Sequence, residues 1–269
     1  MSAPSVLDAI VASAVKRVEV ARARRSLADL EAAIAATRPA SFVASLERPG
    51  IRVIAECKRR SPSRGILRHE YDPVTIAGQY AQAGAAACSV LTEPGFFDGA
   101  LDHLVAVHAA HPALPLLRKD FVVDEYQIAE AVVAGASAVL LIVAALEQQD
   151  LTRLLTYAES IGIDVLTEVH DEDEARRAID AGAAIVGVNN RNLKTLEVSV
   201  ETSRRVAPLL AAARVRVAES GLRSGADLVA LQAHGYGAFL IGERFMTDEN
   251  PGESLAGVLA DAAEAAATS

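Results

Sequence analysis

Short apolar runs alternate with amphipathic stretches from about residue 50 to near the end of the chain. The runs have the length and composition of buried strands, and the stretches between them carry apolar residues at helical spacing. The expected strands are 51–57, 86–91, 114–118, 137–143, 163–168, 184–189, 214–219 and 237–242. The expected helices are 73–83, 99–110, 124–133, 147–160, 171–181, 200–207, 224–233 and 252–266.

This alternation predicts an α/β fold. No hairpin signal joins the strands, so we expect a parallel sheet, and eight strand–helix units predict closure into a (β/α)8 TIM barrel. Glycines follow several helical stretches, as helix ends favour. They are Gly84, Gly135, Gly162, Gly182 and Gly235. An open doubly wound sheet would need a glycine-rich turn after its first strand, where this chain reads Lys-Arg-Arg-Ser-Pro-Ser-Arg-Gly.

Residues 1–48 precede the repeat. Apolar residues between Val6 and Val18 share one helical face, and a second short helix is expected at 26–36. We interpret 1–48 as an N-terminal helical extension packed on a barrel of residues 49–269, the two forming a single domain. A membrane-surface helix and a helix that covers or gates the barrel mouth are the alternatives.

Composition narrows the class of protein. The net charge of −9 disfavours a nucleic-acid partner. No apolar run reaches the length of a membrane span, and the N-terminus lacks the pattern of a signal peptide. Cys57 and Cys88 have neither disulfide nor metal spacing, which favours small buried residues in a reducing compartment. The sequence therefore predicts a cytoplasmic protein.

The end of the first expected strand carries two charges on one face. Strand side chains alternate between faces, so Glu56 and Lys58 follow Ile54 toward the barrel interior. A buried charge is expensive unless it is paired or used. The strand end therefore predicts part of a functional site.

Other strands end in the same way, and strand ends converge at the C-terminal face of a barrel. The further inward residues are Lys119, Glu168, Asn189, Arg191 and Glu219. Carboxylates and amines in one pocket can take different protonation states, so this set predicts acid–base chemistry. A structural ion-pair network is the alternative.

A phosphate site is expected after the last two strands. Small residues at Ser220-Gly221 and Gly242-Glu243 let backbone N–H groups approach an anion, and Ser61 can add a hydroxyl. The side chain of Glu243 is expected to point away. The histidines show no metal spacing, and we interpret His170 as a bystander.

Five motifs, in order, resemble those of the indole-3-glycerol-phosphate synthase family of tryptophan biosynthesis, and the resemblance covers nearly the whole chain. They are Ile-Ala-Glu-Cys-Lys-Arg-Arg-Ser-Pro-Ser (54–63), Leu-Arg-Lys-Asp-Phe (117–121), Thr-Glu-Val-His (167–170), Gly-Val-Asn-Asn-Arg-Asn-Leu (187–193) and Ala-Glu-Ser-Gly (218–221). The resemblance implies a carboxy-lyase that closes the ring of 1-(2-carboxyphenylamino)-1-deoxyribulose 5-phosphate, with release of carbon dioxide and water. It implies no cofactor and no metal.

The resemblance also implies roles for individual residues. Lys119 would be the general acid, Glu168 the general base or the acid–base partner in dehydration, and Lys58 would hold the substrate carboxylate near Glu56. The catalytic set is Glu56, Lys58, Lys119, Glu168, Asn189, Glu219 and Ser220. The set that binds the substrate and its phosphate is Arg59, Ser61, Pro62, Phe97, Phe121, Leu140, Arg191, Leu193, Gly221, Gly242 and Glu243.

Two other functions compete with this one. Phosphoribosylanthranilate isomerase, another phosphate-binding barrel enzyme, would need a Cys and an Asp at opposed strand ends, but Cys57 and Asp120 have outward parity. A non-catalytic barrel that serves as an interaction partner would be expected to have lost Lys58, Lys119 or Glu168. The expected partner is a small anionic substrate. A monomer is expected, with a weak dimer as the alternative.

Overall fold

The computed structural model describes residues 5–34, 39–193 and 195–268. Within these residues, eight parallel strands form a closed barrel in the order β1-β10-β9-β8-β7-β6-β5-β4. The strands are β1 (Arg52–Cys57), β4 (Ala87–Leu91), β5 (Leu116–Lys119), β6 (Ala138–Ile142), β7 (Asp164–Val169), β8 (Ile185–Asn189), β9 (Val215–Glu219) and β10 (Ala238–Ile241). The first and last strands pair from Arg52 with Ala238 to Ala55 with Ile241. The prediction of a (β/α)8 barrel is therefore confirmed.

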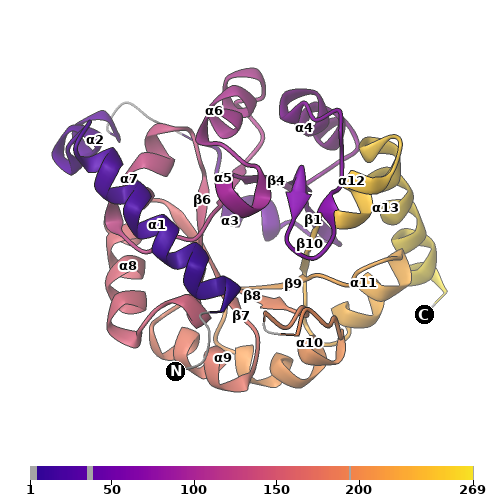
Figure 1. Cartoon of the computed structure of the whole chain (residues 1–269). Coiled ribbons are helices and arrows are strands. Elements are labelled where there is room, and N and C mark those ends of the chain that lie inside the picture. Colours follow the sequence, from indigo (N-terminus) through magenta and orange to yellow (C-terminus); the bar gives the residue numbers. More distant parts are fainter. Residues whose placement is uncertain (1–4, 35–38, 194, 269) are drawn as a thin grey trace.

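Helices surround the barrel (Figure 1). The helices between and after the strands are α4 (Pro73–Gln82), α6 (Leu101–Ala110), α7 (Glu125–Val133), α8 (Gln148–Ser160), α9 (Glu172–Asp180), α10 (Glu201–Val206), α11 (Gly225–Gln232) and α13 (Pro251–Ala267). Asp72, Asp124, Asp171 and Ser224 cap four of them by accepting backbone N–H groups of the first turn. None of the helices in the described part of the chain has the length and apolar character needed to cross a membrane.

Several short elements lie outside the expected pattern. They are the hairpin strands β2 (Arg60–Ser61) and β3 (Gly65–Ile66), the helices α5 (Pro94–Phe97) and α12 (Glu243–Thr247), and the 3-10 turns η1 (Val143–Ala145) and η2 (Ala207–Leu210). β2, β3, α5, η1 and α12 follow strand ends, so they contribute to the barrel mouth.

In the described part of the chain, the apolar side chains of the barrel and its surrounding helices form two concentric cores, and a smaller third cluster joins the N-terminal helices to α7. The inner core fills the barrel and includes Ile54, Leu117, Leu166 and Val217. The outer core lies between the strands and the helices and includes Cys57, a neighbour of the inward-facing Glu56. The strand parity expected from the sequence is thus the parity observed.

The N-terminal segment forms α1 (Val6–Arg22), α2 (Leu27–Ile34) and α3 (Phe42–Leu46). Helix α1 contacts α7 and the turn η1 that follows β6, and it lies across one side of the barrel in Figure 1. Phe42 and Leu46 of α3 join the inner core. The last two residues of the second helix expected at 26–36 lie outside the described residues. The division at residue 48 stays a prediction.

Candidate active site

Lys119 lies between two carboxylates at the C-terminal end of the barrel. Its Nζ is 3.0 Å from Glu168 Oε2 on β7 and 2.9 Å from Glu219 Oε2 on β9. Both carboxylates are buried, and Glu219 Oε1 is buried without a hydrogen-bond partner. A buried polar atom without a partner is costly, so Glu219 Oε1 is available to a ligand.

The environments push the two carboxyl groups apart in pKa. Burial raises the pKa of Glu168, but the charges of Lys119 and His170 outweigh it and hold this pKa well below its usual value. Burial and the charge of Glu168 raise the pKa of Glu219 to about 7, against the opposing charge of Lys119. Burial lowers the pKa of Lys119, yet Glu168, Glu219 and Glu56 together raise it above its ordinary value. Such a divided pair is typical of acid–base sites.

Two glycines leave room for the carboxylates. A Cβ at Gly187 on β8 would collide with Glu219 Oε1, and one at Gly242 would collide with Glu56 Oε1. Gly242, which the sequence assigned to phosphate binding, therefore also lets Glu56 fit at the mouth.

Glu56 and Lys58, which were expected to share the inward face of the first strand, form an ion pair. Lys58 Nζ lies 2.6 Å from Glu56 Oε1, and Glu56 is buried while Lys58 is partly exposed. Because the Lys58 side chain is only partly buried, Lys58 can meet an anionic group that enters the mouth. Glu56 holds it there in the absence of a ligand.

The loop after β9 has an unusual backbone. Ser220 has φ +65° and Gly221 has φ +77°, and a Cβ at Gly221 would press on Val198 Cγ1 at 2.6 Å. A left-handed non-glycine residue is uncommon and is found at functional sites. Asn190 anchors this loop, since its Nδ2 donates to the Ser220 carbonyl at 3.1 Å.

Asn189 and Asn190 end β8 in different ways. Asn189 has inward parity, and its Oδ1 accepts from the backbone N–H of Arg191 at 3.0 Å. Asn190 is buried, and its Oδ1 accepts from the backbone N–H and hydroxyl of Ser203. The sequence pattern alone does not distinguish Asn190 as a functional residue. Its side chain can be recognised only once the loops after β8 and β9 are seen together.

Three arginines at the mouth are already paired. Glu243 accepts from Arg191 at 3.0 Å and from Arg64 at 3.1 Å, so its carboxylate joins the loops after β8 and β1. Its side chain is therefore held across the mouth by these two arginines, so the expectation that it points away is wrong. Arg59 pairs with Asp98.

Ser61 is buried, with its hydroxyl 3.4 Å from Ser63 Oγ, and Pro62 is exposed.

Apolar side chains form one wall of the site. The rings of Phe97 and Phe121 lie 6.2 Å apart and are tilted by 36°. Phe121 and Leu193 pack on the inner core, to which Leu140 belongs. These four residues, expected to hold an aromatic ring, come from helix α5, strand β6 and the loops after β5 and β8.

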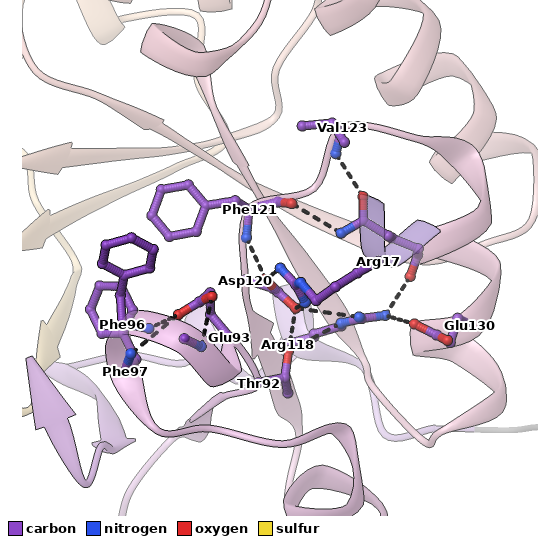
Figure 2. A network of polar contacts seen from close by, with 12 residues as sticks. Arg17, Thr92, Glu93, Phe96, Phe97, Arg118, Asp120, Phe121, Val123 and Glu130 are labelled. Atoms are coloured by element: carbon purple, nitrogen blue, oxygen red, sulfur yellow. Dashed lines mark hydrogen bonds and ion pairs between the residues drawn. The ribbon is translucent and has the colours of Figure 1, made fainter. Parts of the chain in front are cut away.

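A buried polar network lies behind this wall (Figure 2). Asp120, next to Lys119, points out of the barrel and forms a bidentate pair with Arg17 of α1 at 2.8 and 3.1 Å. It also accepts from Thr92 Oγ1 at 2.8 Å and contacts Arg118 at 3.4 Å. Burial raises the pKa of Asp120, but Arg17 and Arg118 more than offset this and lower it. The network ties the N-terminal extension to the strand that carries Lys119.

His170 is not a bystander. Its Nε2 lies 3.2 Å from Glu168 Oε1, and its Nδ1 lies 3.0 Å from Glu174 Oε2 on α9. Its inward parity after β7 was a signal for this contact, but the sequence does not show how far the ring reaches.

In the described part of the chain, no three His, Cys, Asp or Glu side chains are grouped as a metal site. Cys57 and Asp120 both face the helices, so the opposed pair needed by the isomerase alternative is not formed. A barrel with lysines and carboxylates of divided pKa at its mouth defines the class of an acid–base enzyme with an anionic substrate.

Comparisons narrow the class to one family. The model of the family "Indole-3-glycerol phosphate synthase" matches residues 7–258. The indole-3-glycerol phosphate synthase of Mycobacteroides abscessus is 48% identical over 260 residues, 95% of this chain and 94% of that protein. Indole-3-glycerol phosphate synthase 1 of Streptomyces coelicolor is 49% identical over 257 residues, 95% of each chain. The chain belongs to the indole-3-glycerol phosphate synthase family.

More distant solved structures share the barrel alone. A crystal structure of mandelate oxidase with (S)-2-phenylpropionate has a TM-score of 0.61 at 18% identity, over 90% of this chain and 93% of that one. The structure of KGPDC from Streptococcus mutans has a TM-score of 0.62 at 12% identity, over 80% of this chain and 98% of that one. At these identities the likeness concerns the fold.

Proposed function

We propose that the chain converts 1-(2-carboxyphenylamino)-1-deoxyribulose 5-phosphate into indole-3-glycerol phosphate, carbon dioxide and water, in tryptophan biosynthesis. Its family membership supports this reaction. The observation that carries the mechanism is Lys119 between Glu168 and Glu219 at the barrel mouth.

Substrate binding comes first. Lys58 meets the substrate carboxylate beside Glu56, and Phe97, Phe121, Leu140 and Leu193 hold the aromatic ring. Arg191, Arg59 and Pro62 complete the mouth. Glu243 holds Arg191 until an anion competes for the guanidinium.

The phosphate binds at the ends of β9 and β10. The left-handed backbone of Ser220 and Gly221 supports this assignment, because backbone of this shape can turn N–H groups toward an anion. Backbone donors at Gly242 and Glu243 and the Ser61 hydroxyl complete the site. Asn190 keeps the Ser220 loop in place.

Ring closure uses Lys119 as the general acid. The ring carbon that bears the carboxylate attacks the ketone carbon, and the carbonyl electron pair moves to oxygen. Lys119 Nζ gives a proton to this oxygen, which becomes a hydroxyl. Glu219 and Asn189 orient Lys119 and the substrate hydroxyls.

Aromatisation follows. The bond between the ring carbon and the carboxylate breaks, and carbon dioxide leaves. The electron pair of that bond returns to the ring, which removes its positive charge, shared with the nitrogen, and restores its aromaticity. Glu168 then takes a proton from the neighbouring carbon, and the departing hydroxyl receives that proton and leaves as water. Lys119 regains its proton from solvent, so one proton is taken up per turnover.

The proposal includes no cofactor, because each step moves electron pairs within the substrate. It also includes a cytoplasmic location, which the two free buried thiols Cys57 and Cys88 support. A monomer suffices for the mechanism, because the proposed groups all come from one chain. Residues 1–48 and the barrel act together as one domain in this proposal, supported by the Arg17–Asp120 pair.

One assay tests the function. The purified chain is mixed with the carboxyphenylamino substrate, and indole-3-glycerol phosphate is followed by indole absorbance, with carbon dioxide measured in parallel. We expect both products in equal amounts. Absence of both products from a folded chain would contradict the proposal.

A further inference from the structure

A chain of charged groups extends from the reacting centre to the outer helices. Glu168 contacts Lys119 through Oε2 and His170 Nε2 through Oε1, at 3.0 and 3.2 Å. The other ring nitrogen of His170 lies 3.0 Å from Glu174 Oε2. The imidazole thus lies between two carboxylates: it is hydrogen-bonded to Glu174 on α9 and lies at ion-pair distance, without hydrogen-bond alignment, from Glu168 in the barrel.

An imidazole between two carboxylates is most stable when both of its nitrogens carry protons. A neutral ring has one donor and one acceptor nitrogen, so one carboxylate would face a lone pair. Burial lowers the pKa of His170, but its contacts with Glu168 and Glu174 outweigh burial and raise it to about 10. The ring is therefore an imidazolium at neutral pH.

The charges at the mouth explain why this cation matters. Glu56, Glu168 and Glu219 converge there, and Lys119 is shared between the last two. Lys58 pairs with Glu56 on the other side. Without His170, the negative charge of Glu168 would be balanced only by Lys119, which also pairs with Glu219, while two further carboxylates lie at the same mouth.

We infer that His170, held by Glu174, is a positioning residue that keeps Glu168 ionised and oriented toward Lys119. The inference rests on the proposed function, in which Glu168 must be ionised to take the carbon proton. A purely structural role for the ring is not required at this turn. The backbone N–H of His170 already donates to Glu174 Oε2 at 2.8 Å, and Asp171 caps α9.

The test is the pH dependence of kcat in His170→Asn. Asparagine is polar but uncharged, so the pKa of Glu168 rises in the variant. The limb of the kcat profile that reports Glu168 should move to higher pH by about 1 unit or more, the usual effect of one nearby charge, while the limb near pH 7 that reports Glu219 should stay in place. KM should change little, because no substrate contact is removed. His234→Asn, at an exposed histidine, should keep the wild-type profile.

Two further measurements, on a Glu174 variant and on the protonation of His170, test the role of the ring independently. Glu174→Gln leaves the ring in place but removes one of its carboxylates, so its acid limb should move in the same direction by a smaller amount. Histidine NMR of the ligand-free wild type should show His170 as an imidazolium above pH 8. If His170→Asn does not fold, the Glu174→Gln profile decides.

The outcomes separate the inference from the function on which it rests. Product formation by both variants with unshifted pH profiles would overturn the role of His170 and leave the proposed function standing. Absence of product from the wild type would overturn the function, and the NMR titration would still test the ion pair. A neutral His170 ring at pH 7 would refute the inference in either case.

Discussion

At Glu219, the needs of the active site and the stability of the fold conflict most directly. Its side chain is buried, one carboxylate oxygen has no partner, and its pKa is raised to about 7. Its carboxylate fits beside Gly187 only because that position has no side chain, since a Cβ there would collide with Glu219 Oε1. The site thus keeps a buried carboxyl group with an unpaired oxygen, which costs stability.

This residue makes stability depend on pH. A carboxyl group whose pKa is raised on folding stabilises the protein fully below its unfolded value and loses that contribution as pH rises to about 7. Glu219→Gln should therefore gain stability relative to wild type between pH 4.5 and pH 7, by roughly 1–3 kcal/mol. Urea denaturation at pH 5 and pH 8 measures this gain.

Activity gives the matching readout for the same variant. The amide should reduce kcat because it cannot pair with Lys119 as a charge. If the difference in unfolding free energy were the same at both pH values, Glu219 would not titrate in this range, and the division of the two carboxyl groups would be wrong.

The sequence predicted which side chains face the site wherever the alternation of side chains along a strand is sufficient to determine this. Glu56, Lys119, Glu168 and Glu219 all face the barrel interior as expected. The role of His170 could not be predicted. Whether a side chain reaches a carboxylate or solvent depends on packing by α9, which the sequence pattern does not define.

Among the elements, β5 joins the two sides of the barrel wall. Lys119 faces the interior, while Arg118 and Asp120 face the helices and join the network in Figure 2. Arg17 brings α1 into that network. The N-terminal helix therefore supports the strand end on which the proposed acid lies.

Loss of Arg17 tests this support. Arg17→Met leaves the fully buried Asp120 with only its partners on the barrel, so the free energy of unfolding should fall by about 2–4 kcal/mol. We also expect a lower kcat, since the end of β5 loses an anchor. Arg22→Met is the matched control, because Arg22 pairs with Asp124 at the surface and should cost under about 1 kcal/mol.

Urea denaturation and steady-state kinetics of both variants measure these effects. Equal stability of the two variants would mean that α1 contributes no more through Arg17 than through a surface pair. A single cooperative transition in both would support one domain that spans residues 1–48 and the barrel.

The sequence predicted long elements better than short ones. Each barrel strand begins and ends within two residues of its expected range, because apolar runs bounded by glycine and polar turns mark buried strands. The hairpin of β2 and β3 and the helices α5 and α12 were not predicted. These pieces are too short for periodicity, and tertiary contacts such as Arg59 with Asp98 hold them.

At the scale of the whole molecule, closure of the barrel creates the site. Lys119 and Glu219 lie 100 residues apart in the sequence and 2.9 Å apart in space. The order of the strands predicts that their ends share one mouth. It does not predict which charges pair across that mouth, because pairing depends on register and on the space left by glycines such as Gly187.

The central claim is that Lys119 is the proton donor of the ring closure. Lys119→Met keeps most of the stem, and it removes an interaction made chiefly in the transition state. Lys16→Met, at an exposed lysine of α1, is the matched control. Circular dichroism establishes that each variant is folded.

The most direct measurement is therefore kcat for indole-3-glycerol phosphate formation by wild type, Lys119→Met and Lys16→Met, with substrate affinity measured separately by equilibrium binding. We predict that Lys119→Met loses about 10²-fold or more in kcat with little change in affinity, and that Lys16→Met keeps wild-type activity. A folded Lys119→Met variant with near-wild-type kcat would contradict the account.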